Sequence, residues 1–226
     1  DGKTDLVVGA YAYSTSTGHV YIFYNDGVYP SLAANADVIL TGETSSNYFG
    51  NSFSVGDLNA DGKVDLVVGA YGYSSNAGRA YIFYADGTSN FGTATCSGTP
   101  AACSAANADV IITGEAATYF SVDSLATGDI NADGKTDLIV GAPSYSSNAG
   151  RSYIFYNDGS IPTTAATADV IINGQTSSYF GRALAVGDLN ADGKRDLVIS
   201  ASDYPGSGRA YIFYNDGSIP TTAATA

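Results

Sequence analysis

The chain has 226 residues, and only 14% of them are charged, yet its formal net charge is −13. An acidic chain repels nucleic-acid phosphates and anionic lipids, and the chain has no apolar run long enough to span a membrane. We therefore expect no nucleic-acid partner and no membrane insertion. The remaining surface is mostly Ser, Thr, Asn, Gly and Tyr, a neutral polar composition that predicts an extracellular or cell-surface location.

Internal repetition organises the chain into four units, approximately 1–48, 49–118, 119–178 and 179–226. A complete unit contains a lead-in such as SFSVGDLN, an apolar run such as LVVGA, the run YIFY and the run ADVI, and we predict a short strand at each. LVVGA and YIFY are almost continuously apolar, which indicates strands covered on both faces. The first unit lacks its lead-in and the last ends before ADVI, so the expected strand counts are three, four, four and three.

Four short strands per repeat at this period are typical of a propeller blade. The predicted fold class is therefore all-β: a single β-propeller segment over 1–226, built of four-stranded blades, with the first and last incomplete. We interpret it as a slice of a longer repeat chain. Helices are not expected, because the strong helix formers Glu, Lys and Met are scarce or missing.

Between the lead-in and the second strand lies a nine-residue pattern, D-x-N-x-D-G-x-x-D, present three times whole and once cut at the start of the chain. Oxygen ligands at alternate positions followed by a turn-forming Gly predict a loop around a hard cation, and Ca²⁺ accepts six to eight oxygens. The Lys residues would contribute only backbone carbonyls. The predicted ligands are Asp1, Lys3 and Asp5 in the partial loop, and Asp57, Asn59, Asp61, Lys63, Asp65, Asp129, Asn131, Asp133, Lys135, Asp137, Asp188, Asn190, Asp192, Lys194 and Asp196 in the three complete loops.

These loops begin like an EF-hand but end differently. An EF-hand has Glu at position 12 and helices on both sides, whereas position 12 is here Val68 and both flanks are strand-like. The alternative is a series of Asp-Gly and Asn-Asp turns without metal. Three copies with identical ligand spacing favour calcium.

Short motifs around the loops point to a family. Phe49-Gly50 and Phe180-Gly181 open two repeats, and Gly141-Ala142-Pro143 follows a loop. The chain thus resembles the FG-GAP repeats of integrin alpha-subunit propellers and of bacterial surface proteins. The resemblance implies a calcium-binding extracellular propeller whose ligands bind opposite the calcium loops. It is imperfect: Ser121 replaces the second residue of one Phe-Gly pair, Gly-Ala-Tyr stands at 9–11 and 69–71, and the last repeat has Ser-Ala-Ser at 200–202.

The second repeat carries an insertion at 92–104 that contains both cysteines, Cys96 and Cys103. Outside the cell they are expected to form a disulfide. Two free thiols, or half of a metal site, are the alternatives.

Catalytic signals are weak. His19 occupies the position that holds Arg in the other repeats, and no nucleophile accompanies it. Glu43 and Glu115 lie in equivalent turns of different repeats, which are expected to be too far apart for a glycosidase pair. Most Tyr residues are assigned to packing between blades, but the loops after the second strand carry a further set that could build a recognition face: Tyr11, Tyr13, Tyr71, Tyr73 and Tyr145.

The hypothesis is a calcium-stabilised, non-catalytic segment for adhesion, or for binding of a protein or glycan ligand. One alternative is a structural repeat of a surface fibre, sheath or array, whose partners are other copies of itself. The second is a non-catalytic scaffold within a larger secreted enzyme.

Overall fold

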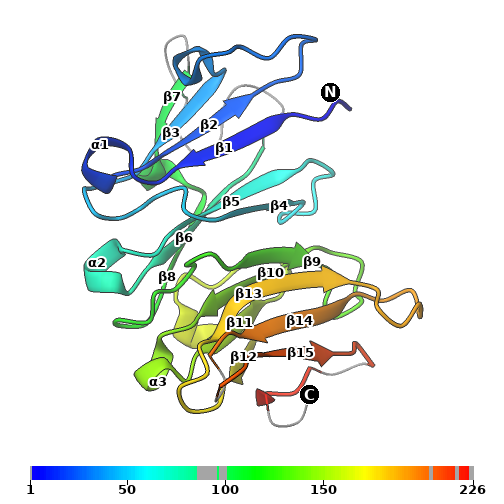
Figure 1. The fold of residues 1–226 in the computed structure, drawn as a ribbon. Coiled ribbons are helices and arrows are strands. Elements are labelled where there is room, and N and C mark those ends of the chain that lie inside the picture. The colour runs from blue at the N-terminus through cyan, green and yellow to red at the C-terminus, as the bar shows by residue number, and fades with distance from the viewer. Residues whose placement is uncertain (1, 86–95, 97–100, 204–205, 217–218, 224–226) are drawn as a thin grey trace.

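A computed structural model describes residues 2–85, 96, 101–203, 206–216 and 219–223, which form four small β-sheets arranged one after another (Figure 1). The all-β, propeller-like class is confirmed. The first sheet contains β1 (Leu6–Ala10), β2 (His19–Phe23), β3 (Val38–Thr41) and β7 (Ala101–Ser104). The second sheet contains β4 (Phe53–Gly56), β5 (Asp65–Ala70), β6 (Arg79–Phe83) and β8 (Val110–Thr113), and the third contains β9 (Leu125–Gly128), β10 (Asp137–Ala142), β11 (Arg151–Phe155) and β12 (Val170–Asn173). The last sheet contains β13 (Phe180–Gly187), β14 (Asp196–Ala201) and β15 (Arg209–Phe213).

The central hairpin of every sheet keeps one register. In the second sheet Leu66 on β5 faces Phe83 on β6, and Ala70 faces Arg79. The other three hairpins pair equivalent residues in the same way. The sequence repeat is therefore a repeat in space, and equivalent positions can be compared directly between sheets.

The end of the insertion extends the first sheet instead of its own. The first sheet therefore has four strands and not the expected three, because a strand of the following repeat joins it. Strand β7 pairs in parallel with β3, with Cys103 opposite Leu40. Isolated parallel bridges join Thr113 to Thr164 and Asn173 to Thr222 at the corresponding edges of the next two sheets. Each outer edge is thus continued by a segment of the following repeat, which ties neighbouring repeats together. Apart from Cys96 and residues 101–104, the insertion at 92–104 lies outside the described residues.

The predicted disulfide joins Cys96 to Cys103 across a Cα–Cα distance of 4.9 Å. Both cysteines are buried, and they belong to the apolar cluster between the first two sheets, together with Val38 and Leu40. The disulfide therefore anchors the insertion to this core.

The helical elements are single turns: α1 (Tyr13–Ser16), α2 (Tyr73–Asn76), α3 (Tyr145–Asn148) and the 3₁₀ turns η1 (Ala33–Asn35), η2 (Ala105–Asn107) and η3 (Ala165–Thr167). Inside α2, Ser74 and Ser75 have positive φ of 48° and 56°, so this turn is left-handed and not an ordinary helix. Within the described residues, no helix has the length and apolarity needed to span a membrane.

The Phe residues that open the second, third and fourth repeats pack between neighbouring sheets. Phe120 is fully buried, and its ring meets that of Tyr153 edge-on at 5.5 Å between centroids. On the other side it is enclosed by Gly78 and Gly114, where any Cβ would overlap atoms of Phe120. Phe49 and Phe180 make the equivalent ring contacts with Tyr81 and Tyr211. The glycines are thus required for the close approach of neighbouring blades.

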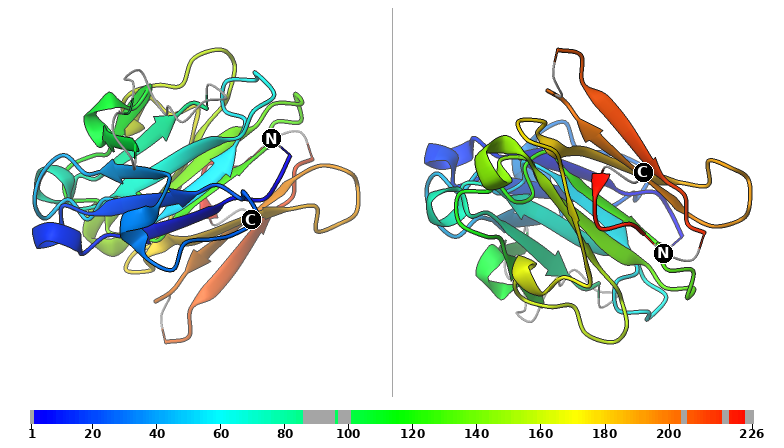
Figure 2. Two further views of the ribbon diagram at one scale, coloured as in Figure 1. Left: turned by 90° about the horizontal axis from the view of Figure 1, so that it is seen from above. Right: turned by 90° about the horizontal axis from the view of Figure 1, so that it is seen from below.

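The described sheets do not close into a ring. Leu6 on β1 is 44% exposed, whereas its counterpart Leu66 is 2% exposed. Ile212 on β15 is 41% exposed, whereas its counterpart Ile82 is fully buried. Viewed from above and below, the last sheet, in orange and red, is turned relative to the first, in blue (Figure 2). The first and last sheets therefore each present a partly bare face.

Candidate metal loops and the tyrosine face

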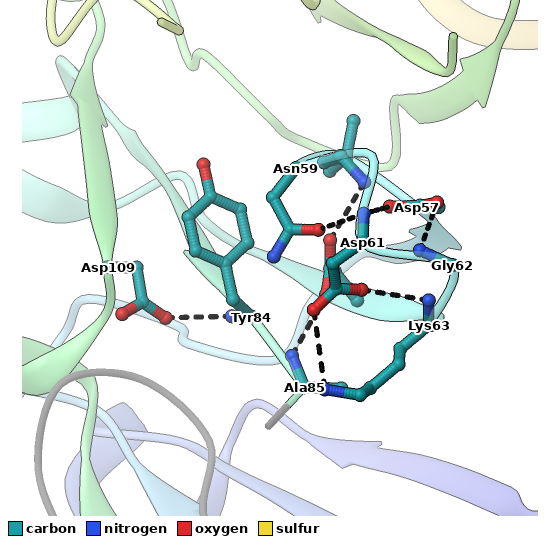
Figure 3. A network of polar contacts seen from close by, with 10 residues as sticks. Asp57, Asn59, Asp61, Gly62, Lys63, Tyr84, Ala85 and Asp109 are labelled. Carbon is teal, nitrogen blue, oxygen red and sulfur yellow. Dashed lines mark hydrogen bonds and ion pairs between the residues drawn. The ribbon is translucent and has the colours of Figure 1, made fainter. Parts of the chain in front are cut away.

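Each complete loop folds around its own carboxylates. In the second repeat, the Asp61 amide donates to Asp57 Oδ1 at 3.1 Å and to Asn59 Oδ1 at 3.0 Å (Figure 3). The Gly62 amide donates to Asp57 Oδ2 at 2.9 Å, and the Lys63 amide donates to Asp61 Oδ1 at 2.8 Å. The same four bonds recur in the loops that begin at Asp129 and Asp188. Three loops therefore hold one backbone conformation, with alternate side-chain oxygens turned inward.

The ninth residue of each loop joins the loop to the end of the next strand. Both oxygens of Asp65 accept backbone amides, from Leu58 at 2.8 Å and from Ala85 at 2.9 Å. Asp137 and Asp196 make the corresponding two bonds. These three residues are fully buried, so each carboxylate organises its loop from inside. In the partial loop, Asp5 likewise accepts the Asn25 amide at 2.8 Å.

Electrostatics differs among the loop carboxylates. Burial raises the pKa of Asp65 and Asp137, because desolvation outweighs the amide bonds that stabilise the charged form. The amide of Asn215 lowers the pKa of Asp196. The amide of Lys63 also lowers the pKa of the exposed Asp61. A cation in a loop would favour the charged form of each of these carboxylates.

The donor set fits a hard cation, since each loop combines carboxylate and amide oxygens with available backbone carbonyls. The side-chain oxygens of a loop do not all point to one common centre. Among the described residues, no three His, Cys, Asp or Glu side chains are grouped closely enough to hold a metal. Two oxygens of the ninth Asp are directed to backbone amides, and Asp1 lies outside the described residues. The sequence predicted the loop positions, but it did not indicate this additional role of the ninth Asp.

A second constellation joins neighbouring sheets and was missed by the sequence reading. Glu43, which follows β3, accepts bonds at its Oε1 from Arg79 Nη1 and from the Tyr81 hydroxyl, both at 2.7 Å. The Arg79 guanidinium also lies 3.5 Å from the ring centroid of Tyr73. Glu115, Arg151, Tyr153 and Tyr145 repeat the arrangement at the next interface. We call each such set an interblade latch.

Burial is the larger cause, and the hydrogen bond to Glu43 the second, of a pKa of the Tyr81 hydroxyl far above its usual value. The hydroxyl therefore stays protonated and donates. In the first sheet His19 takes the Arg position, as predicted, and stacks on Tyr13 at 3.9 Å. Burial lowers the pKa of His19. Glu43 and Glu115 therefore belong to two separate latches.

At the strand ends opposite the metal loops, tyrosines from three repeats form a row. The rings of Tyr48 and Tyr71 stack at 4.7 Å with an interplanar angle of 12°. Tyr119 continues the row at 5.9 Å from Tyr71, and Tyr11 extends it at 6.4 Å from Tyr48. The loops that carry these tyrosines lie on the same side of the molecule as the turns α1 to α3 (Figure 1). Of the residues predicted for a recognition face, Tyr11 and Tyr71 belong to this row, whereas Tyr73 and Tyr145 belong to the latches.

The repeated loops, latches and opening Phe residues can be compared with known proteins. The sequence model described as FG-GAP repeat matches residues 49–83, 121–155 and 180–213. Each match contains one complete metal loop and the hairpin that follows it. This chain is an FG-GAP repeat protein.

Relatives of this FG-GAP chain include a phospholipase D and integrin alpha subunits. Phosphatidylinositol-glycan-specific phospholipase D of Mus musculus is 35% identical over 158 residues, which are 66% of this chain and 18% of that protein. Integrin alpha-X of Homo sapiens is 31% identical over 208 residues, 88% of this chain and 16% of that protein. Integrin alpha-5 of Xenopus laevis is 29% identical over 216 residues, 89% of this chain and 18% of that protein. The chain thus spans less than a fifth of each of these relatives.

The departure from the FG-GAP pattern at Ser121 leaves the backbone intact. Ser121 has a positive φ of 70°, close to the 85° and 89° of Gly50 and Gly181. Its hydroxyl donates to the carbonyl of Arg79 at 2.8 Å. This bond compensates for part of the strain of a left-handed non-glycine residue.

We predict that Asp61→Ala destabilises the protein more than Asp37→Ala does, but only in calcium. Each exposed carboxylate accepts one backbone amide, from Lys63 and from Tyr24 respectively, so the metal-free losses should be small and similar. In calcium, Asp61→Ala should also lose ion binding, about 2–3 kcal/mol for one site at roughly 100 times its Kd. Urea unfolding of both variants, with calcium and with EDTA, measures the difference. Equal losses in both buffers would contradict the ligand assignment.

The third FG-GAP interface offers a test of the latch. Gln175 stands where the first two interfaces have Glu, and the buried Tyr211 hydroxyl has no hydrogen-bond partner among the residues that the structure describes. Gln175→Glu should stabilise the protein by about 1 kcal/mol, because a carboxylate accepts a stronger bond. Glu115→Gln should cost about 1–3 kcal/mol by the reverse change. Chemical denaturation checks both values. A gain from Gln175→Glu that survives in a Tyr211→Phe background would not come from a bond to the Tyr211 hydroxyl.

Proposed function

We propose that this chain is a calcium-stabilised, extracellular β-propeller segment that binds a protein or glycan ligand and does not itself catalyse a reaction. The observation that supports it best is the division between its two sides. One end of the strands carries three identical oxygen-rich loops, and the other end carries the tyrosine row. Structural ions on one side leave the opposite side available for recognition.

Calcium is proposed for the three complete loops, with the ligands named from the sequence, and for the partial loop through Lys3 and Asp5 together with Asp1. Within the loops, the bonds from amides to Asp57 and Asn59 already set the turn that a hard cation requires. The ion would supply charge compensation for clustered carboxylates, and hence stability, instead of chemistry on a substrate.

The relatives support adhesion and an extracellular setting, since two of them are integrin alpha subunits. The phospholipase D relative keeps open the scaffold role in a larger enzyme. Its resemblance covers a small share of that enzyme, so the activity is not transferred to this chain.

Association with further copies is the second candidate function. Leu6 and Val8 are exposed on the first sheet and Ile212 is exposed on the last, although their counterparts inside the stack are buried. Faces of this kind match the contacts that already join successive blades. Light scattering at several concentrations tests it: concentration-dependent growth favours self-association, and a constant monomer mass argues against it.

The test of the proposed function is a calcium titration followed by a binding assay. The melting temperature should rise with calcium, and the labelled chain should bind extracellular glycans or proteins in calcium but not in EDTA. A melting temperature that does not respond to calcium would refute calcium stabilisation. Binding of equal strength in EDTA would refute its link to recognition.

A further inference from the structure

A pocket of about 390 Å³ opens beside the tyrosine row, a volume within the range of small-ligand sites. Tyr11, Tyr71 and Tyr119 form its aromatic wall, and Asn51, Asp123 and Arg182 supply polar groups. These side chains come from separate repeats, so only the packing of the blades assembles the pocket.

The aromatic wall is held by contacts between its rings and remains accessible. Tyr11 is 47% exposed, and Tyr71 and Tyr119 are partly buried, in contrast to the completely buried Tyr81 and Tyr153 of the core. Stacking within the row restricts ring motion, which lowers the entropy lost on binding. Burial, and to a smaller extent the neighbouring Tyr48, raises the pKa of Tyr71. Its hydroxyl is therefore neutral and can both donate and accept a hydrogen bond.

The row ends at this pocket because of one substitution. Pro143 stands where two earlier repeats have Tyr11 and Tyr71, and it lines the pocket next to Tyr119. The left-handed Tyr119, with φ of 53°, therefore has a tyrosine on one side only. Its other side is not covered by a further ring of the row.

The polar side of the pocket is balanced in charge. Asp123 Oδ2 and Arg182 Nη2 are 3.5 Å apart, and both side chains are about half exposed, at 48% and 50%. Asn51 Oδ1 accepts the Asp123 amide at 3.1 Å, which fixes the loop that carries the carboxylate. A strongly charged ligand would have to break this ion pair, whereas a neutral ligand with hydroxyl groups can bond to both members.

We propose that this pocket binds a neutral oligosaccharide, a conclusion that rests on the proposed recognition function. A sugar ring presents apolar C–H groups and hydroxyls together, and the pocket offers an exposed tyrosine ring beside Asn, Asp and Arg. The half-exposed ring of Tyr11 provides the flat apolar contact, and Asn51, Asp123 and Arg182 provide the hydrogen bonds. A protein partner would need a larger area than this pocket, of about 800 Å² on each side.

The experiment uses the whole chain in calcium on an array with neutral oligosaccharides, anionic oligosaccharides and peptides. Binding to neutral glycans is expected, weakened about tenfold or more by Tyr71→Ala, which removes a pocket wall. Tyr214→Ala is the matched control, since Tyr214 is 50% exposed and does not line the pocket. It should bind like the unmodified chain.

Arg182→Gln is a second variant that leaves the aromatic wall in place, and it should also weaken neutral-glycan binding. Binding only to anionic glycans or only to peptides, binding to none, or neutral binding unaffected by either pocket variant would overturn the inference. Calcium-dependent melting, recorded in parallel, separates the two claims. A chain that is stabilised by calcium but binds peptides only would retain the proposed function and lose the glycan site.

Discussion

Calcium is expected to raise the free energy of unfolding by up to about 8 kcal/mol, if each of three loops contributes about 2.7 kcal/mol at roughly 100 times its Kd. Loops that lack a twelfth-position Glu should have a weak Kd, on the order of 10⁻⁴ M, so roughly 10 mM calcium reaches this regime. The physical reason is repulsion: Asp57, Asp61 and Asp65 lie within one short loop, and a bound cation would compensate their charges. Urea unfolding in calcium and in EDTA measures the effect.

Single-loop variants provide the control for this experiment. Asp133→Ala should remove roughly one third of the calcium response and leave the other two loops intact. Magnesium should replace calcium poorly, because it demands a smaller octahedral shell and loses water reluctantly. An unfolding free energy that is identical in calcium and EDTA would mean that the loops are turns held by their own amide bonds.

Phe120→Ala is expected to cost about 3–5 kcal/mol, the second largest effect, because it empties a fully buried site between two sheets. The surrounding backbone cannot collapse easily, since Gly78 and Gly114 already touch the Phe120 residue. The ring contact with Tyr153 is also lost. Equilibrium unfolding in saturating calcium, so that metal occupancy stays constant, gives the value.

Phe53→Ala is the matched control, since Phe53 lies on β4 and is 41% exposed. It should cost about 1 kcal/mol or less. If Phe120→Ala prevents folding, Phe120→Leu should still fold with a loss of about 1–2 kcal/mol. Comparable losses for Phe53→Ala and Phe120→Ala would show that the opening Phe is not the main contact between blades.

Calcium binding and the Phe120→Ala substitution affect different parts of the same repeat. Calcium acts on the loops at one end of the strands, whereas Phe120 acts between the sheets. Removing calcium should therefore leave the loss caused by Phe120→Ala nearly unchanged, because distant sites contribute additively. Strong coupling would indicate that metal binding also sets the spacing of the blades.

The sequence by itself determined the local features of this protein. Strand periodicity, the turn-forming Gly62 and the alternating oxygens of Asp57, Asn59 and Asp61 are encoded within a few neighbouring residues, and repetition made each signal stronger. For the same reason the all-β class and the disulfide could be predicted. The Arg position taken by His19 followed from aligning the repeats.

Only the tertiary structure decided what lies between repeats. The hydrogen bonds from Arg79 and Tyr81 to Glu43 join residues that are 36 and 38 positions apart in the sequence. No local sequence pattern predicts which turn faces which strand. The pairing of β7 with β3 likewise depends on how two sheets are placed. The tyrosine row and its pocket arise in the same way, because side chains from different repeats meet only after the sheets have packed. Periodicity describes each blade, whereas the contacts between blades depend on their relative orientation, which the packing of Phe49, Phe120 and Phe180 sets.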